Sequence, residues 1–163
     1  MKRIIIIAMA LLMTAGAYAQ EGKRLYNKYS DSEGVSAVYI SPAMFRMIGS
    51  LPELDVEVSD GEKMDLAPLV RSFTGFYMLS ISDDAMAEEL NKEVKTMIAK
   101  GRYEMLMEIK ENGNEIHIYT SGNDKIIDSF VFIAEEENST AFICLEGSMN
   151  RSDVENLIAK SAR

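Results

Sequence analysis

The chain has 163 residues, a formal net charge of −9 at pH 7 and a single cysteine, Cys144. An acidic chain is a poor partner for nucleic acid or for an anionic membrane surface, because both repel it. A single cysteine rules out an intramolecular disulfide, so the hydrophobic core alone must hold the fold together.

Residues 1–19 have the pattern of a secretory signal peptide. Lys2-Arg3 precedes an apolar run from Ile4, and Ala17-Tyr18-Ala19 matches a small-residue cleavage motif. We expect cleavage after Ala19, export to the periplasm or the medium, and no stable membrane insertion afterwards. The alternative is an uncleaved membrane anchor, although the run is short for a spanning helix and ends in small residues.

Cleavage would leave residues 20–163, enough for one domain with a real core but not for two. Of the 17 basic residues two leave with the leader, so 15 remain against 26 acidic residues, a net charge of about −11. This charge is compatible with a basic partner, although it also suits any soluble exported protein. We expect a single α+β domain.

The first half of the mature domain predicts helices and two strands. Residues 20–34 read as a short helix or an ordered arm. Ser41-Pro42 begins a helix that ends at Gly49, because serine is a favoured N-cap and proline suits the first helical position. The acidic stretch 51–63 is the best candidate for an exposed loop, with a short edge strand around Val56 as an alternative. The remaining elements are strand 35–40, helix 64–73, strand 76–82 and helix 83–100.

Residues 103–147 read as four consecutive antiparallel strands, on which the other elements pack. Asn112-Gly113 separates two alternating runs and suits a type I′ turn, since both residues tolerate positive φ angles. Three pairs then form one apolar face: Ile109 with Ile116, Met107 with Ile118, and Met105 with Thr120. Three pairs form the opposite face, which we expect to be wet near the turn: Lys110 with Glu115, Glu108 with His117, and Leu106 with Tyr119.

Strands 126–135 and 141–145 are apolar on both faces, which predicts that they lie under helices. Consecutive hairpins form a meander, because strands adjacent in sequence usually pair. A final helix docks through Val154, Leu157 and Ile158. The expected fold class is therefore α+β: an antiparallel sheet with a C-terminal four-strand meander and helices packed mainly on one face.

Residues for the common catalytic sites are scarce. His117 is the single histidine, and we expect it to be a cross-strand partner of Glu108 rather than a catalytic base. Cys144 lies in an apolar strand, which predicts a buried and unreactive thiol. One histidine and one cysteine do not suffice for a usual zinc site, and the sequence has no glycine-rich phosphate loop. We therefore expect no enzyme activity, no catalytic residue, no cofactor and no metal.

Carboxylates are numerous, so two alternatives stay open. A carboxylate-dependent hydrolase would need two acidic side chains that converge in a pocket, at least one with a perturbed pKa. Calcium could bind to the acidic loop 55–65, although its spacing does not match the EF-hand pattern. The acidic runs 83–84 and 135–137 also suit a helix start and a turn.

Methionine is abundant: the chain has 12, of which three lie in the leader. Six of the others fall on predicted apolar faces, where methionine fills irregular gaps: Met44, Met47, Met86, Met97, Met105 and Met107. The simplest interpretation is core packing. The functional alternatives are a pliable apolar groove for a lipid, a peptide or a partner helix, and a thioether copper(I) site.

Several short motifs resemble those of a known family. They are Tyr29-Ser30, Gly34-Val35 with Val38-Tyr39-Ile40-Ser41, Met44-Phe45, and Leu145-Glu146-Gly147 before a short amphipathic helix. In these the chain is similar to an uncharacterised Bacteroidetes family of small exported proteins that carry a domain of unknown function. The resemblance spans most of the mature chain and transfers no site, since that family has no assigned activity. Its genes often lie near those of extracytoplasmic-function sigma factors and their anti-sigma partners, which implies a role in envelope signalling.

Three functional hypotheses follow. The first is a non-catalytic periplasmic interaction domain with a protein partner in the cell envelope and an exposed surface at Leu106, His117 and Tyr119. The second is a carrier of an apolar ligand, a lipid or a peptide, in a cavity lined by the six methionines between sheet and helices. The third is the carboxylate-dependent hydrolase.

Overall fold

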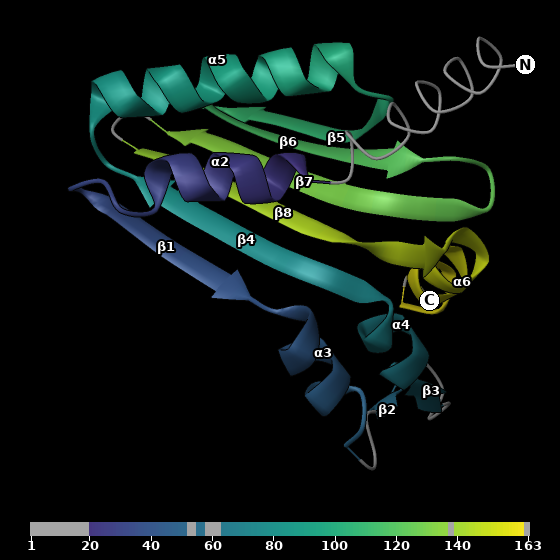
Figure 1. The fold of residues 1–163 in the computed structure, drawn as a ribbon. Coiled ribbons are helices and arrows are strands. Elements are labelled where there is room, and N and C mark those ends of the chain that lie inside the picture. Colours follow the sequence, from purple (N-terminus) through teal and green to yellow (C-terminus); the bar gives the residue numbers. More distant parts are fainter. Residues whose placement is uncertain (1–19, 52–54, 58–62, 137–138, 162–163) are drawn as a thin grey trace, which may run out of the picture.

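The computed structural model describes residues 20–51, 55–57, 63–136 and 139–161, so the predicted leader lies outside the described residues. Within this part the order of elements matches the expected α+β pattern (Figure 1). The helices are α2 (Glu21–Tyr29), α3 (Pro42–Ile48), α4 (Ala67–Arg71), α5 (Asp84–Lys100) and α6 (Arg151–Ser161). The strands are β1 (Val35–Ile40), β2 (Asp55–Glu57), β3 (Lys63–Asp65), β4 (Phe73–Ile81), β5 (Tyr103–Glu111), β6 (Asn114–Gly122), β7 (Ile126–Glu136) and β8 (Ser139–Asn150).

Six antiparallel strands form the main sheet in the order β1-β4-β8-β7-β6-β5. The predicted C-terminal meander is confirmed, because β5 to β8 pair in sequence order. The sheet extends beyond it because β4 pairs with β8 and β1 pairs with β4. The acidic stretch expected to be a loop contains β2, which pairs with β3 in a separate two-stranded sheet. None of the described helices has the length and apolar character needed to cross a bilayer.

The β5–β6 hairpin has the predicted two-residue turn. Asn112 and Gly113 have φ angles of 52° and 87°, as a type I′ turn requires. The pairs next to the turn match the prediction, including Ile109 with Ile116 and Met107 with Ile118. Further from the turn the prediction is wrong, since the register shifts between Met105 and Met107 and Met105 pairs with Tyr119. The extra residue in this bulge is Leu106, and an inserted residue exchanges the faces of everything beyond it.

Helices α3 and α5 begin where the sequence predicts, each after a residue that caps its first turn. The Ser41 hydroxyl oxygen accepts a hydrogen bond from the Met44 N–H at 3.2 Å, and the Asp83 carboxylate accepts one from the Met86 N–H at 2.8 Å. Both are N-caps that satisfy an otherwise unpaired backbone donor. The helix expected at 64–73 is shorter in the structure, because both flanks of α4 pair as strands β3 and β4.

The main core lies between one face of the sheet and helices α2 and α5, which run side by side over it (Figure 1). Leu25 and Leu90 are fully buried contributions from the two helices. Every second strand residue faces them, as the two-residue period of a strand requires. The buried members of this core are Leu25, Tyr29, Tyr77, Leu79, Ile81, Ala87, Leu90, Val94, Met97, Val131, Ile133, Phe142 and Cys144.

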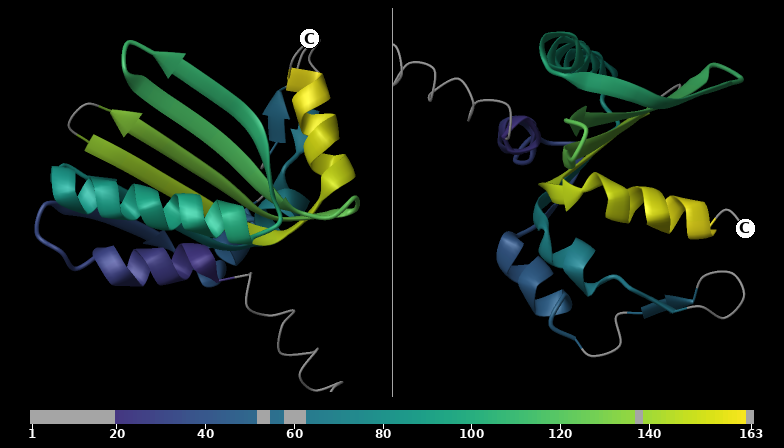
Figure 2. Two further views of the ribbon diagram at one scale, coloured as in Figure 1. Left: turned by 90° about the horizontal axis from the view of Figure 1, so that it is seen from above. Right: turned by 90° about the vertical axis from the view of Figure 1, so that its right-hand side faces the viewer.

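A smaller core lies at one end of the opposite face. Ile127 and Met149 pair across β7 and β8 and pack with Val154 of α6. The pairing of β7 shifts by a bulge between Ile127 and Ser129, both with β6 and with β8. The inserted residue reverses the alternation, so Ile127 and Met149 face away from α2 and α5. Figure 2 shows α6 extending from the side of the strands opposite to α2 and α5. The helices are thus divided between the two faces, with α2 and α5 covering one and α6 only the end of the other.

Candidate functional site

The face of the sheet opposite α2 and α5 carries a continuous apolar surface. Its central row crosses all six strands, and each residue is the direct cross-strand partner of the next: Val38, Met78, Ile143, Phe132, Ile118 and Met107. A row on one side contains Ile40, Phe76, Leu145 and Phe130, and a row on the other contains Ala141, Ala134, Ile116 and Ile109. These fourteen residues are called the open apolar face below.

Successive side chains of a strand point to opposite faces of the sheet, so this surface lies on the side away from α2 and α5. The neighbours of its residues along each strand, such as Leu79 and Val131, fill the core under α2 and α5. Of the fourteen, Phe130 packs against the small core at α6. On the two edge strands of the sheet the side chains are largely exposed to solvent: Val38 of β1 is 45% exposed and Met107 of β5 is 49% exposed. A contiguous apolar patch that the fold leaves open is typical of a binding surface rather than of an ordinary monomer surface.

The open apolar face ends in an acidic row at the hairpin turns. Glu111 lies two residues beyond Ile109, and Glu136 lies two residues beyond Ala134, so both stay on the open side of their strands. Both carboxylates are exposed, and neither forms an ion pair with a described residue. Ser139 donates a hydrogen bond to Glu136 at 3.2 Å. The row of Ile40, Phe76, Leu145 and Phe130 continues through Thr120 of β6 to Glu104 of β5, so the open side also carries a carboxylate at that edge.

Next to this acidic row lies a hollow of about 330 Å³ between the N-terminal half of α5 and the turn ends of the strands. Five carboxylates line it, from Asp84, Glu88, Glu115, Glu135 and Glu136, and this set is called the acidic hollow below. Lysines pair with three of them: Lys92 with Glu88, Lys95 with Glu135 and Lys110 with Glu115. The hollow therefore retains a net negative charge.

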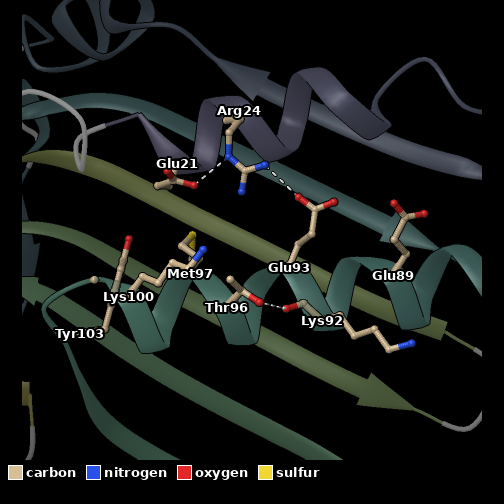
Figure 3. A pocket seen from close by; sticks show the side chains of 10 residues that line it. Glu21, Arg24, Glu89, Lys92, Glu93, Thr96, Met97, Lys100 and Tyr103 are labelled. Atoms are coloured by element: carbon tan, nitrogen blue, oxygen red, sulfur yellow. Dashed lines mark hydrogen bonds and ion pairs between the residues drawn. The ribbon is translucent and has the colours of Figure 1, made fainter.

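A second groove, of about 490 Å³, separates α2 from α5 (Figure 3). Its three glutamates, Glu21, Glu89 and Glu93, all form ion pairs with Arg24 or Lys28. Glu93 accepts hydrogen bonds from Lys28, from Arg24 at 2.8 Å and from the Tyr29 hydroxyl at 2.8 Å. Burial opposes ionisation of Glu93, but these three donors outweigh it and lower its pKa to about 2. The network holds α2 against α5, so we assign it a structural role.

A buried carboxylate lies beneath the first turn of α2. Glu146 is 7% exposed and accepts a hydrogen bond from the Gly22 N–H at 3.1 Å. Burial raises the pKa of Glu146 to about 7, although the backbone donors of α2 act in the opposite direction. Gly22 is needed here, because a Cβ at this position would lie 2.6 Å from the Cys144 sulfur. Glu146 thus caps the start of α2 on the sheet.

The structure confirms the predicted burial of Cys144 and the predicted pairing of His117 with Glu108. Cys144 is buried, and burial raises the pKa of its thiol, which makes it a poor nucleophile. His117 Nε2 lies 3.0 Å from Glu108 Oε1, so the predicted cross-strand pair is present. Among the described residues no group of three histidine, cysteine, aspartate or glutamate side chains could hold a metal ion. The stretch 55–65, considered above as an alternative calcium loop, lies partly outside the described residues.

The surface predicted at Leu106, His117 and Tyr119 is not a single exposed patch. His117 is only 7% exposed, because α5 covers this face, and its ring stacks on Tyr119. Tyr119 is partly buried against the main core, whereas Leu106 is exposed at the bulge. The expectation that this face is wet is therefore wrong at His117. Pattern alone could not reveal which face α5 covers, since both faces of the hairpin contain apolar residues.

The six methionines predicted to line a groove occupy three separate places. Met97 is buried in the main core and Met86 packs against it. Met44 and Met47 are exposed on α3, and Met105 and Met107 are exposed on β5. Only Met107 belongs to the open apolar face. Sequence analysis placed Ile109, Ile116 and Ile118 on one apolar face but not in a site, and the residues from the other strands were missed, although the two-sided apolar strands 126–135 and 141–145 were a signal for them.

Comparison with known proteins identifies a family but no activity. Residues 29–157 match the family described as Domain of unknown function (DUF4252), so the chain belongs to this family. No curated protein matches the chain. A solved structure of PA94, a protein of unknown function from Pseudomonas aeruginosa, has 9% sequence identity and a TM-score of 0.32 and covers 77% of this chain and 76% of its own. A similarity at this level carries no functional argument.

Proposed function

We propose that this family member is a non-catalytic interaction domain that binds an apolar partner on the open apolar face. The central row from Val38 to Met107 carries the proposal, because six apolar side chains cross the whole sheet without a covering helix. Protein surfaces normally bury contiguous apolar area of this kind. A partner that covers this face would bury apolar surface that the fold leaves exposed to water, and this burial favours binding.

The groups that a catalytic site would need have structural roles instead. His117 pairs with Glu108 at the hairpin, and Glu146 caps α2. The Cys144 thiol is buried, and its raised pKa disfavours the reactive thiolate. For the hydrolase hypothesis, Glu146 has a perturbed pKa, but its hydrogen bond to the Gly22 N–H already uses it in the fold. These observations favour binding over catalysis.

Among apolar partners, the arrangement favours a surface partner over a carrier with a methionine-lined cavity. Such a cavity would need the methionines of α3, α5 and β5 to converge, and they lie in separate parts of the structure. The open apolar face is instead a broad surface of aliphatic and aromatic side chains. The place of action that we propose is the periplasm or the medium, with a link to envelope signalling. It is supported by the signal-peptide pattern of residues 1–19 and by the family resemblance.

Site-specific photocrosslinking in the cells that produce the protein tests this function. A photoreactive residue at Met107, which is 49% exposed within the face, should give a discrete crosslinked species. The matched control is Met47 on α3, which is 68% exposed but outside the face, and it should give none. Addition of Phe132→Ser to the Met107 probe should remove the species. Equal crosslinking at both positions, or none at Met107, would contradict the proposal.

A further inference from the structure

We infer that a second copy of this chain pairs with the outer edge of β1, antiparallel and centred on Val38, so that two six-stranded sheets join into one. This inference goes beyond the proposed function, because it concerns an edge of the sheet and not the partner on the open apolar face. It follows from four properties of the described residues: the unpaired edge of β1, its lack of protection, its side-chain pattern, and the charges at its two ends.

Strand β1 is an edge strand whose outer side has no partner. It pairs with β4 on one side and stands at the end of the sheet on the other (Figure 1). Apart from the Val35 N–H, which donates to the Ser32 carbonyl oxygen at 3.3 Å, its backbone bonds only to β4 within the described residues. Every second residue of an antiparallel edge strand directs an N–H and a C=O outward, and this row of groups is a template for another strand.

The two edges of the sheet differ in how they are protected. Strand β5 carries features that prevent edge-to-edge pairing, namely four charged residues among nine and a bulge at Leu106. Its turn end also adjoins the acidic hollow, which would repel a second acidic chain. Strand β1 has no charged residue and no proline, and it pairs with β4 without a register shift. The edge that suits a partner strand is therefore β1.

Large apolar side chains are exposed along β1 and just after it. Val38 and Tyr39 are each nearly half exposed, and they lie on opposite faces of the strand. A strand added at this edge would cover part of both, so apolar burial would favour the pairing together with the backbone hydrogen bonds. Of the ten large apolar side chains that are exposed in the described residues, five lie between positions 38 and 51: Val38, Tyr39, Met44, Met47 and Leu51.

The side chains of β1 are self-complementary around Val38. A two-fold axis at this residue sets Val38 against Val38 of the other copy. In each flanking pair a large side chain then meets a small one: Tyr39 with Ala37, and Ile40 with Ser36. Residues paired across strands share a face, so both copies present α2 and α5 on the same side. The central row of the open apolar face would then continue from one copy into the other.

The charges at the two ends of β1 are complementary in this arrangement. Asp31 and Glu33 precede the strand and Arg46 follows it on α3; all three are exposed, and none forms an ion pair with a described residue. Antiparallel pairing brings the acidic end of each copy to the end where the partner's α3 begins. Opposite charges therefore approach one another twice, which offsets part of the repulsion between two acidic chains. This complementarity favours a second copy over an unrelated strand.

Sedimentation velocity of the purified protein at micromolar concentration tests the inference, and the expected species is a dimer. Val38→Lys sets two like charges directly opposite each other and should raise the dimer dissociation constant by at least about tenfold. The matched control is Met107→Lys, because Met107 ends the same row on the other edge strand and is similarly exposed. This variant should leave the dimer intact. Circular dichroism checks that both variants keep the fold.

Cysteine crosslinking tests the register and does not depend on the lysine variants. Native Cys144 is buried, so an introduced cysteine is the accessible thiol. Val38→Cys should give a disulfide-linked dimer under mild oxidation, because directly paired residues have Cα atoms about 4.5–5.5 Å apart. Ser36→Cys is the control, since it is exposed on the same face but its two copies would lie about 14 Å apart in this register. It should give no disulfide.

Three outcomes would overturn the inference. The first is a monomer in the sedimentation experiment together with no disulfide for Val38→Cys. The second is a dimer that Met107→Lys dissociates and Val38→Lys does not, which would place the contact at β5. The third is a disulfide for Ser36→Cys but not for Val38→Cys. None of these bears on the proposed function, because the photocrosslinking experiment reports on Met107 and Phe132, away from β1.

Discussion

Replacement of Glu146 by glutamine should change how the stability of the protein depends on pH. In the folded protein, burial raises the pKa of this carboxyl from 4.5 to about 7. The folded state therefore holds the proton more tightly than the unfolded state. The stabilisation from Glu146 is full below about pH 4.5 and is lost as the pH rises toward 7.

The expected magnitude follows from the shift. One pKa unit corresponds to about 1.4 kcal/mol, so a shift of this size is worth on the order of 3 kcal/mol between pH 4.5 and pH 8. Glutamine stays neutral across this range and keeps an oxygen that can accept the Gly22 N–H. The free energy of unfolding of Glu146→Gln, relative to the unmodified protein, should therefore rise by about this amount as the pH increases.

Urea unfolding of both proteins at several pH values between 4.5 and 8 measures this difference. The test is the change of this difference with pH. The glutamine amide also changes the free energy of unfolding, but by the same amount at every pH. Glu33→Gln serves as the control, since Glu33 is exposed, and its difference from the unmodified protein should be small and flat. A flat difference for Glu146→Gln would show that Glu146 does not titrate with a raised pKa and would refute the reasoning.

Two further substitutions test the attachment of α2. Glu93→Gln removes the ionised acceptor of three hydrogen bonds and should lower the free energy of unfolding by about 1–2 kcal/mol in urea at neutral pH, since its partners are partly exposed. Because the pKa of Glu93 is lowered to about 2, its contribution is present above about pH 4.5 and should disappear as the pH falls toward 2. Gly22→Ala places a methyl group 2.6 Å from the Cys144 sulfur and should cost about 1–3 kcal/mol in the same assay; an unchanged midpoint would contradict the close packing.

Local features of this protein were predictable from the sequence because they depend on neighbouring residues. The Asn112-Gly113 turn determines the register of the nearest pairs, from Ile109 with Ile116 to Met107 with Ile118. The caps at Ser41 and Asp83 depend on hydrogen bonds that span three residues. The apolar surroundings of Cys144 likewise predicted its burial.

Two differences from the sequence prediction concern strand pairing, which depends on the partner strand as well as on the strand itself. The bulge at Leu106 changes the partner of Met105, and no residue type in this run marks the insertion. The stretch 51–63 was expected to be an exposed loop or to add a short edge strand around Val56; the structure has the strand, Asp55–Glu57, and its partner is Lys63–Asp65 in a separate two-stranded sheet rather than the main sheet. Short strands of this kind depend on a partner rather than on their own pattern.

The candidate site depended most strongly on tertiary structure. Sequence determined that strands such as β7 and β8 are apolar on both faces, which follows from the two-residue period of a strand. It did not determine which face α2 and α5 would cover, because either face of these strands could have packed against an apolar helix stripe. Only the folded arrangement places Val38, Phe132 and Met107 in one row, since strand order in a sheet is set by pairing between residues far apart in the chain.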